Sequence, residues 1–235
     1  GSQYLEFPPR EWSLRWYRNY LGSSSWMQAT ATSFQAGALT TLVATPLGTL
    51  AAYGLFASRL RAARGLHTLM PTPIIVPVIL VAIGVCYVYV KIKLVNSLAG
   101  IVLAHSMLPL PLPLPLPLPL VMLVVGAALK GFDMNQKMVA RSLGASRARA
   151  FWSVTLPQIR FSLVSAALLS FLTSFDEVIL ALFIAGGSNS TLTRNMFNAL
   201  RDQIDPTIAA ISTLMIVVTT LLLALAQFYG RQREA

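Results

Sequence analysis

The sequence predicts an all-α protein whose helices cross a membrane as a polytopic bundle. Hydrophobic residues make up 55% of its 235 residues and charged residues only 11%, whereas about a quarter of the residues in a soluble domain are charged. Four apolar segments are long enough to cross about 30 Å of hydrocarbon as helices, and a fifth is long enough but interrupted by prolines. The net charge of +10 does not indicate nucleic-acid binding, because the basic residues lie in short segments between the apolar ones.

The first element is a segment at the membrane surface, residues 1–33. Trp12, Trp16 and Tyr20 recur every four residues, and this spacing predicts a short helix from Trp12 to Leu21 with its rings among the lipid headgroups. We interpret this helix as an anchor.

Five spans follow in the predicted transmembrane domain, residues 34–229, and residues 230–235 form a tail. The predicted spans are Phe34–Phe56, Leu69–Val90, the interrupted Leu98–Leu129, Phe161–Ala185 and Ile208–Tyr229.

Lysine and arginine predict the orientation, because short cytoplasmic loops carry an excess of both. Eleven of the 18 fall on the side that holds residues 130–160 and the tail. We therefore expect this 130–160 loop in the cytoplasm and the first segment outside. Five spans after an external start imply a further span preceding Gly1.

A run of six prolines alternates with leucine from Pro109 to Pro119. Each proline inside a helix costs about 3 kcal/mol, so we expect no α-helix here. Polyproline II would leave carbonyl groups unsatisfied in lipid. The segment is either extended and enclosed by protein or an anomaly of the sequence, and the cost of unsatisfied backbone favours the anomaly.

The 130–160 loop has the pattern of two short helices joined by a turn. The first is expected to end near Gly144, which permits a left-handed backbone, and Ser146 can cap the second. Phe151 and Val154 share one face of that second helix. Pro157 then stops or redirects the chain.

The same loop combines aromatic and basic side chains. We expect Phe151 and Trp152 to be exposed beside several cations, which suits docking to a soluble partner. On physical grounds alone, an ordinary positive-inside loop is the alternative.

This loop resembles the EAA loop of the inner-membrane permeases of binding-protein-dependent ABC importers, and the chain resembles the spermidine and putrescine branch most. The matching residues are Ala140, Gly144, Phe151, Leu156 and Pro157. Further resemblance lies in Gly131–Asp133, Ser174–Gly187 and Thr191–Thr213, so that it covers nearly all of the chain after Leu39. Met138 departs from the family, because it stands where the motif has an acidic residue.

The resemblance implies a type I permease fold in the bacterial inner membrane and a set of partners. The loop would insert into an ATPase subunit through Ala140, Arg141, Gly144, Ala145, Ser146, Phe151, Leu156 and Pro157. Two ATPase subunits would supply ATP and magnesium chemistry, beside a second permease subunit and a periplasmic solute-binding protein. Gly186–Pro206 would help receive that protein, with a plain connecting loop as the alternative. We expect no catalytic site in this chain, which contains no nucleotide-binding glycine loop.

Asp176 and Glu177 are the acidic residues inside a predicted span. A carboxylate at mid-membrane costs at least about 2.5 kcal/mol, so both should face protein or water. Ser170, Thr173, Ser174 and Glu177 have the spacing of one helix face, which predicts a polar stripe along a translocation path. We expect one carboxylate to face the cavity and the other an adjacent helix. Such charge favours a small cation, and a polyamine fits; a purely structural carboxylate is the alternative.

Two other classes of function are alternatives. The sequence lacks the residues of a catalytic site, because His67 and His105 lie apart from any carboxylate cluster or nucleophile. The lone Cys86 cannot form a thiolate metal site. An ion-coupled secondary transporter or channel would suit the spans and the acidic pair, and an ABC importer for another small solute would share the same motifs. The loop favours an ATP-driven permease.

Overall fold

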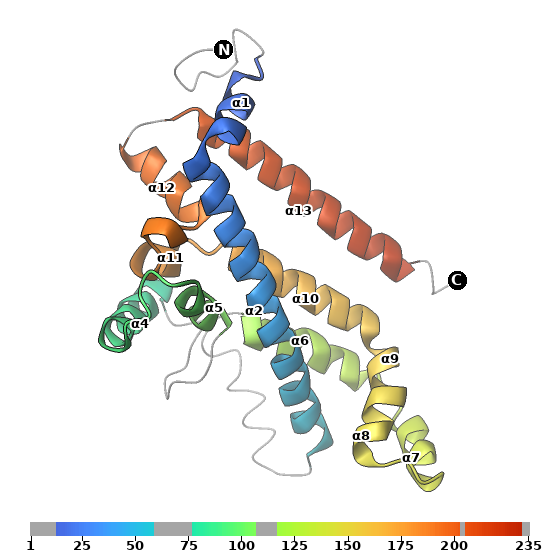
Figure 1. Cartoon of the computed structure of the whole chain (residues 1–235). Helices are drawn as coiled ribbons and strands as arrows, with labels where there is room; N and C mark the ends of the chain where they lie inside the picture. Colours follow the sequence, from blue (N-terminus) through green and yellow to red (C-terminus); the bar gives the residue numbers. More distant parts are fainter. Residues whose placement is uncertain (1–12, 59–76, 107–116, 203–204, 232–235) are drawn as a thin grey trace.

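The structure, a computed structural model, describes residues 13–58, 77–106, 117–202 and 205–231. These residues form helices and contain no strand, which confirms the all-α prediction (Figure 1). The elements are α1 Arg15–Gly22, α2 Ser24–Ala57, α4 Val78–Ile92, α5 Leu98–Ser106, α6 Pro117–Lys130, α7 Met134–Ser142, α8 Arg147–Ala150, the π-helix η2 Phe151–Thr155, α9 Leu156–Gln158, α10 Arg160–Phe175, α11 Ile179–Ile184, the 3₁₀-helix η3 Gly187–Asn189, α12 Leu192–Asp202 and α13 Thr207–Arg231.

Helix α2 is the central element and packs against α5, α6, α10 and α12. Its 34 residues span about 50 Å at 1.5 Å per residue. Its buried residues are all small: Ala29, Thr32, Ser33, Ala36, Gly37, Thr40, Ala44, Thr45, Gly48, Thr49 and Ala52. Small side chains allow helix backbones to approach closely where lipid supplies no hydrophobic force between helices.

Two glycines of α2 show how close that approach is. A Cβ on Gly37 would lie 2.9 Å from the Phe171 ring of α10, and one on Gly48 would lie 2.7 Å from Val121 Cγ1 of α6. Large side chains of α2, such as Leu42 and Leu50, are instead exposed. The small face therefore packs against protein, and the leucine face is left for lipid.

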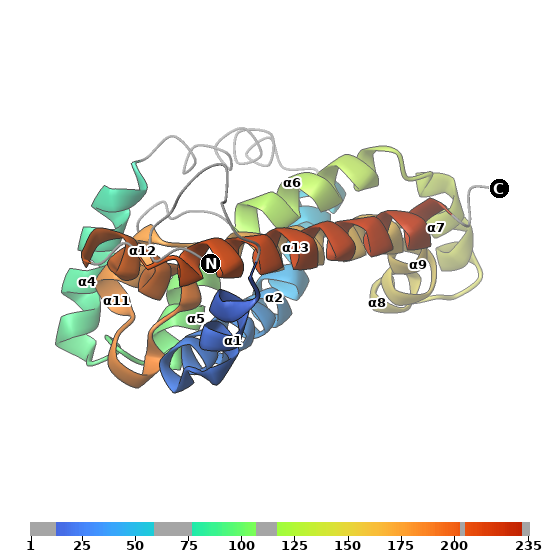
Figure 2. The ribbon, with the colours of Figure 1, turned by 90° about the horizontal axis from the view of Figure 1, so that it is seen from above.

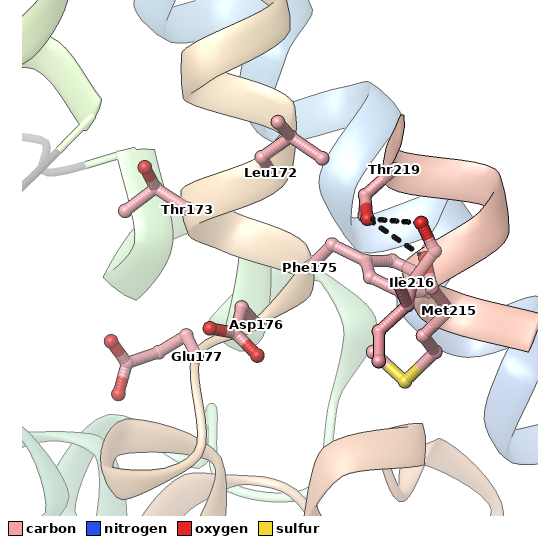
Figure 3. A pocket seen from close by; sticks show the side chains of 8 residues that line it. All are labelled: Leu172, Thr173, Phe175, Asp176, Glu177, Met215, Ile216 and Thr219. Carbon is pink, nitrogen blue, oxygen red and sulfur yellow. Dashed lines mark hydrogen bonds between the residues drawn. The ribbon is translucent and has the colours of Figure 1, made fainter. Parts of the chain in front are cut away.

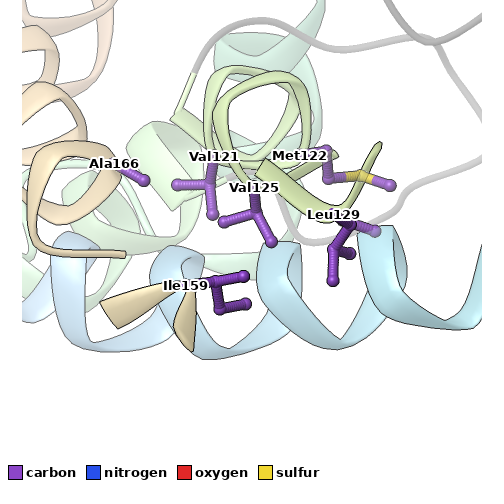
Figure 4. Close-up of a cluster of buried hydrophobic side chains, with 7 residues drawn as sticks. Val121, Met122, Val125, Leu129, Ile159 and Ala166 are labelled. Atoms are coloured by element: carbon purple, nitrogen blue, oxygen red, sulfur yellow. The ribbon is translucent and has the colours of Figure 1, made fainter. Parts of the chain in front are cut away.

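The apolar core lies where α2, α6 and the start of α10 meet (Figure 4). Its buried members are Ala52, Val121, Met122, Val125, Leu129, Ile159 and Ala166. A second cluster joins α4, α5 and α11 through Val81, Ala82, Val85, Tyr89, Ala104, Leu180 and Ile184. Helix α13 runs lengthwise along the molecule, and its last turns lie on the side where α7, α8 and α9 are found (Figure 2).

The described helices revise several predicted spans. Two helices, Ser24–Ala57 and Thr207–Ala224, are long and apolar enough to cross a membrane, or up to four if each of two bent helix pairs counts as one span. The predicted span 161–185 was wrong as one helix, because α10 ends at Phe175 and α11 begins at Ile179. Residues 69–76 and 107–116 of the second and third predicted spans lie outside the described residues.

The proline run is partly helical, contrary to the prediction. Pro117 begins α6 and Pro119 lies in its first turn, where a missing amide hydrogen breaks no intrahelical bond. The earlier prolines of the run lie outside the described residues.

The predicted surface helix is α1, but Tyr20 does not lie among headgroups. Its side chain is buried, and its hydroxyl shares a hydrogen bond of 2.7 Å with Thr30 Oγ1 of α2. Trp12 lies outside the described residues. Helix α1 is thus fixed to the bundle through its inner face.

Candidate functional site

The 130–160 loop folds as the predicted helix–turn–helix. Asp133 Oδ1 accepts a hydrogen bond from Asn135 N at 2.9 Å at the start of α7, and Gly144 turns the chain with φ +90°. Ser146 Oγ then accepts from Arg149 N at 3.2 Å and caps α8. The sequence predicted both the turn at Gly144 and the cap at Ser146, because each of these positions needs a specific residue type.

The loop helices lie across the ends of the long helices (Figure 1). The axis bends by 79° between α6 and α7. It bends by 78° between the segment Arg147–Gln158 and α10. The redirection predicted at Pro157 therefore takes place two residues later, at Ile159, and the proline itself lies inside α9.

Phe151 was expected to be exposed, and that prediction was wrong. Its side chain is 5% exposed, and its ring centroid lies 4.5 Å from that of Tyr53 on α2. Trp152, the next residue of the same helical segment, is 65% exposed as predicted. Burial separates the two because the inner face of this segment rests on the end of α2.

Most other residues expected to couple to an ATPase lie at the loop surface. Arg141, Gly144, Ser146 and Pro157 are exposed, and Ala140, Ala145 and Leu156 are half-buried. Sequence reasoning missed three exposed apolar side chains of the loop, Met138, Val139 and Leu143. Their signal was available: apolar residues in a loop otherwise rich in cations.

The acidic pair lies at the break between α10 and α11. Asp176 and Glu177 line a cavity of about 520 Å³. The other lining residues come from α10 and α13 (Figure 3): Leu172, Thr173, Phe175, Met215, Ile216 and Thr219. Both residues contribute to the lining of this cavity, and the Glu177 carboxylate also contacts α11. The expectation that one carboxylate faces the cavity and the other an adjacent helix stays a prediction.

The predicted polar stripe does not exist as one face. Ser170 and Ser174 are 0% and 4% exposed and point into the bundle, where Ser174 Oγ and His105 Nδ1 of α5 share a hydrogen bond of 2.9 Å. Thr173 faces the cavity instead. The spacing argument assumed a continuous helix, and the end of α10 at Phe175 removes Glu177 from it.

Glu177 also organises the chain after the break. Its Oε1 accepts a hydrogen bond from Leu180 N at 2.9 Å, and its backbone carbonyl accepts from Thr193 Oγ1 at 3.0 Å. The first bond caps α11, and the second ties the break to α12. Asp176 has an exposed side chain, for which no such bond is seen among the described residues.

The segment 186–202, toward the opposite end of α2 from the loop, is held by polar contacts to α2. Ser33 Oγ accepts from Leu192 N at 2.8 Å, and Gln28 Nε2 donates to Ser188 O at 3.0 Å. Phe197 is 42% exposed, and burial lowers the pKa of Arg194 below its ordinary value. The remaining residues singled out from the sequence are Thr193, which is buried, Met196, which is half-buried, and Arg201, which pairs with Asp202 at 2.9 Å.

Metal chemistry has no evident place in the described part of the chain. Within those residues no group of three or more histidine, cysteine and acidic side chains lies close enough to hold an ion. Cys86 Sγ donates to Phe183 O at 3.5 Å, and His67 lies outside the described residues.

Comparison with known proteins identifies the family. The sequence profile described as "binding-protein-dependent transport system inner membrane component" matches residues 44–234. The chain belongs to this family. It is therefore a membrane protein and the permease component of a binding-protein-dependent ABC importer, as the loop had suggested.

The relatives of this permease are named for the transport of different solutes. It is 28% identical over 212 residues to the putrescine transport system permease protein PotI of Escherichia coli K12, covering 87% of this chain and 73% of PotI. It is 26% identical over 222 residues to the spermidine/putrescine transport system permease protein PotC of Haemophilus influenzae, covering 94% and 83%. It is also 29% identical over 224 residues to the molybdenum transport system permease protein ModB of Mycobacterium bovis, covering 92% and 82%.

A solved structure supports the fold of this permease. A bacterial ABC transporter involved in the import of the acidic polysaccharide alginate matches with a TM-score of 0.70 at 13% identity, covering 94% of this chain and 81% of that chain. The type I permease fold inferred from the loop is thus confirmed. The number of membrane passes and the orientation stay predictions.

Proposed function

We propose that this permease imports a small organic cation of the polyamine class, driven by ATP that separate ATPase subunits hydrolyse. One observation carries the choice of cargo: Asp176 and Glu177 line the cavity between α10 and α13, and no lysine or arginine is among its described lining residues. Two negative charges without a local counter-ion attract a cation.

The magnitude of that attraction suits transport. A cation 4 Å from one carboxylate gains about 1 kcal/mol in water and about 4 kcal/mol near a protein surface. An open, wetted cavity lies between these limits, so each carboxylate contributes enough to select charge without trapping the solute. The Phe175 ring beside the pair adds an apolar wall for the carbon chain of a polyamine.

The names of PotI and PotC support this cargo, while the name of ModB keeps an importer for another small solute as the second candidate. The 130–160 loop supplies the site for the ATPase, because Trp152 and Leu143 are exposed beside arginines. A second permease subunit and a periplasmic binding protein complete the assembly, with ATP and magnesium bound by the ATPase pair.

Uptake by the complete importer tests the proposal. The chain is reconstituted with its ATPase, second permease and binding protein, and ATP-dependent uptake of labelled putrescine and spermidine is measured for Asp176→Asn and Glu177→Gln. Glutamine retains an oxygen for Leu180 N, so this variant removes charge and keeps the cap. We expect each to slow uptake about tenfold, the effect of roughly 1.4 kcal/mol.

Thr219→Val is the matched control, since it changes a polar group of the same cavity without changing charge. Its uptake should stay close to that of the wild type. Wild-type rates in both carboxylate variants, or wild-type import of an anionic solute in place of polyamines, would contradict the proposed cargo.

A further inference from the structure

The end of α2 meets the 130–160 loop at three side chains, Tyr53, Lys137 and Phe151, which we name the α2–loop joint. Lys137 Nζ of α7 lies 4.7 Å from the centroid of the Tyr53 ring. The Phe151 ring of η2 lies 4.5 Å from the same ring at an interplanar angle of 52°. One aromatic ring of α2 therefore contacts both halves of the loop.

Lys137 is an unusual residue for this position. Its side chain is 9% exposed, although lysine is almost never buried unless its charge is paired. No carboxylate pairs with it among the described residues, where the ion pair found is Arg201–Asp202. The face of Tyr53 is the partner present, and a cation over an aromatic face is held more strongly as water is removed.

The joint is connected to the cavity through α2, which contains Pro46 between its two ends. Helix α2 is continuous from Tyr53 back to Phe34. The Phe34 ring packs edge-on against the Phe175 ring of α10, with the two ring centroids 5.0 Å apart. Phe175 directly precedes Asp176 and lines the cavity with it. Motion of the loop end of α2 thus has a packed route to the acidic pair.

The loop contains a compliant element next to the joint. Residues Phe151–Thr155 form a π-helix between α8 and α9, and Thr155 Oγ1 within it is buried without a partner among the described residues. Short π-helical turns inside α-helices are less stable than α-helix and often mark functional sites. The π-turn therefore lies directly at Phe151, between the exposed Trp152 and the contact with Tyr53.

We propose that Lys137, Tyr53 and Phe151 are positioning residues that hold the 130–160 loop onto α2, so that ATPase-driven displacement of the loop moves α2 and shifts Phe34 against Phe175 at the cavity. This inference rests on the proposed role of the loop as the ATPase site. It names the residues that transmit the displacement of the loop to α2.

The test uses the complete importer with two variants of the joint. Lys137→Met keeps the aliphatic stem and removes the charge, and Tyr53→Leu keeps apolar volume and removes the ring. The measurement is the stimulation of ATPase activity by binding protein saturated with putrescine, together with recovery of ATPase subunits on purification. We expect stimulation to fall about tenfold in both, within the range of allosteric couplings, with unchanged recovery of the ATPase.

Three variants serve as controls. Lys137→Arg keeps the cation and Tyr53→Phe keeps the ring, so both should couple as the wild type does. Lys91→Met removes the cation that lies 4.4 Å over the exposed Tyr87 ring of α4, far along the chain from the joint. All three should stay within about twofold of wild type, since the first two keep the interacting group and the third lies outside the joint.

A solute-independent measurement separates this inference from the proposed function. ATP binding to the wild-type complex should change hydrogen exchange at residues 28–37 of α2, and Lys137→Met should abolish that change. A wild-type complex without an ATP response at residues 28–37 overturns the inference, whereas loss of ATP-dependent uptake in the assay above contradicts the proposed function. A wild-type response that persists in Lys137→Met, or equal loss in Tyr53→Phe and Tyr53→Leu, overturns the inference.

The double variant Lys137→Met/Tyr53→Leu provides the last criterion. Residues that act as a pair give a double variant no worse than either single one, and we expect that result. If the losses of ATPase stimulation in the two single variants multiply in the double variant, Lys137 and Tyr53 have independent structural roles. That result would overturn the inference. If Tyr53→Leu does not assemble, the contrast between Lys137→Met and Lys137→Arg decides in the same way.

Discussion

Phe151 and Trp152 are adjacent in the sequence, and we predict that replacing each with alanine affects a different property of the loop. Phe151 is 5% exposed and rests on Tyr53, whereas Trp152 is 65% exposed. Phe151→Ala should loosen the 130–160 loop on the permease. Trp152→Ala should leave the loop folded and weaken its affinity for the ATPase.

The magnitudes follow from burial. Truncating a buried phenylalanine costs about 3–5 kcal/mol, which is large for a loop of short helices that depend on tertiary contacts. Trp152 leaves about 160 Å² of its surface free, taking about 250 Å² for a tryptophan. At about 25 cal/mol per Å² its burial by a partner is worth at most about 4 kcal/mol. Truncating an anchor residue of an interface costs about 2 kcal/mol or more of binding free energy. The dissociation constant of the ATPase–permease complex should therefore rise at least about thirtyfold.

Two measurements on the purified permease assembly check this pair. Hydrogen exchange across residues 134–158 reports the folding of the loop, and binding of the isolated ATPase to nanodisc-embedded permease reports affinity. Phe151→Ala should raise exchange throughout the loop, and Trp152→Ala should alter affinity alone. Unchanged affinity in Trp152→Ala together with unchanged exchange in Phe151→Ala would refute the reasoning.

Three further predictions concern packing and turns. Gly144→Ala should destabilise the loop by about 1–2 kcal/mol, because φ is +90° and a side chain disfavours that region; loop hydrogen exchange measures it, and exchange equal to wild type would contradict it. Gly48→Ala should lower the thermal unfolding temperature of the detergent-solubilised permease, since its Cβ would lie 2.7 Å from Val121 Cγ1, whereas the open position Gly54→Ala should not. His105→Ala should destabilise the permease by about 1–3 kcal/mol through the unpaired buried hydroxyl of Ser174, and the same scan tests it against His105→Asn.

Local chemistry explains which features of the loop the sequence could predict. Gly144 and Ser146 need special backbone geometry or a side-chain acceptor at one position, and such requirements are visible in the residue type. The exposure of Phe151 was not predictable in this way. Phe151 and Trp152 are both large and aromatic, and only the position of Tyr53, about a hundred residues earlier, decides which ring is covered.

The acidic site shows the same division. Composition predicted that Asp176 and Glu177 are functional because carboxylates are rare in apolar segments. The helix period then misplaced their neighbours, since it could not show that α10 ends at Phe175. Ser174 turned out to bond with His105, and Met215 and Thr219 of α13 joined the cavity without any signal in the sequence.

The sequence by itself determined the all-α membrane class, the family, the turn and cap of the 130–160 loop, and the presence of two costly carboxylates. The class, the turn, the cap and the carboxylates follow from composition and short-range chemistry, which neighbouring residues specify without the rest of the chain, and the family follows from the resemblance of the loop to a known motif. Only the tertiary structure decided that α10 breaks at the acidic pair, that α13 lines one side of the cavity and that Lys137 lies over Tyr53. Such contacts join residues far apart in the chain, and their energies depend on burial, which is a property of the folded whole.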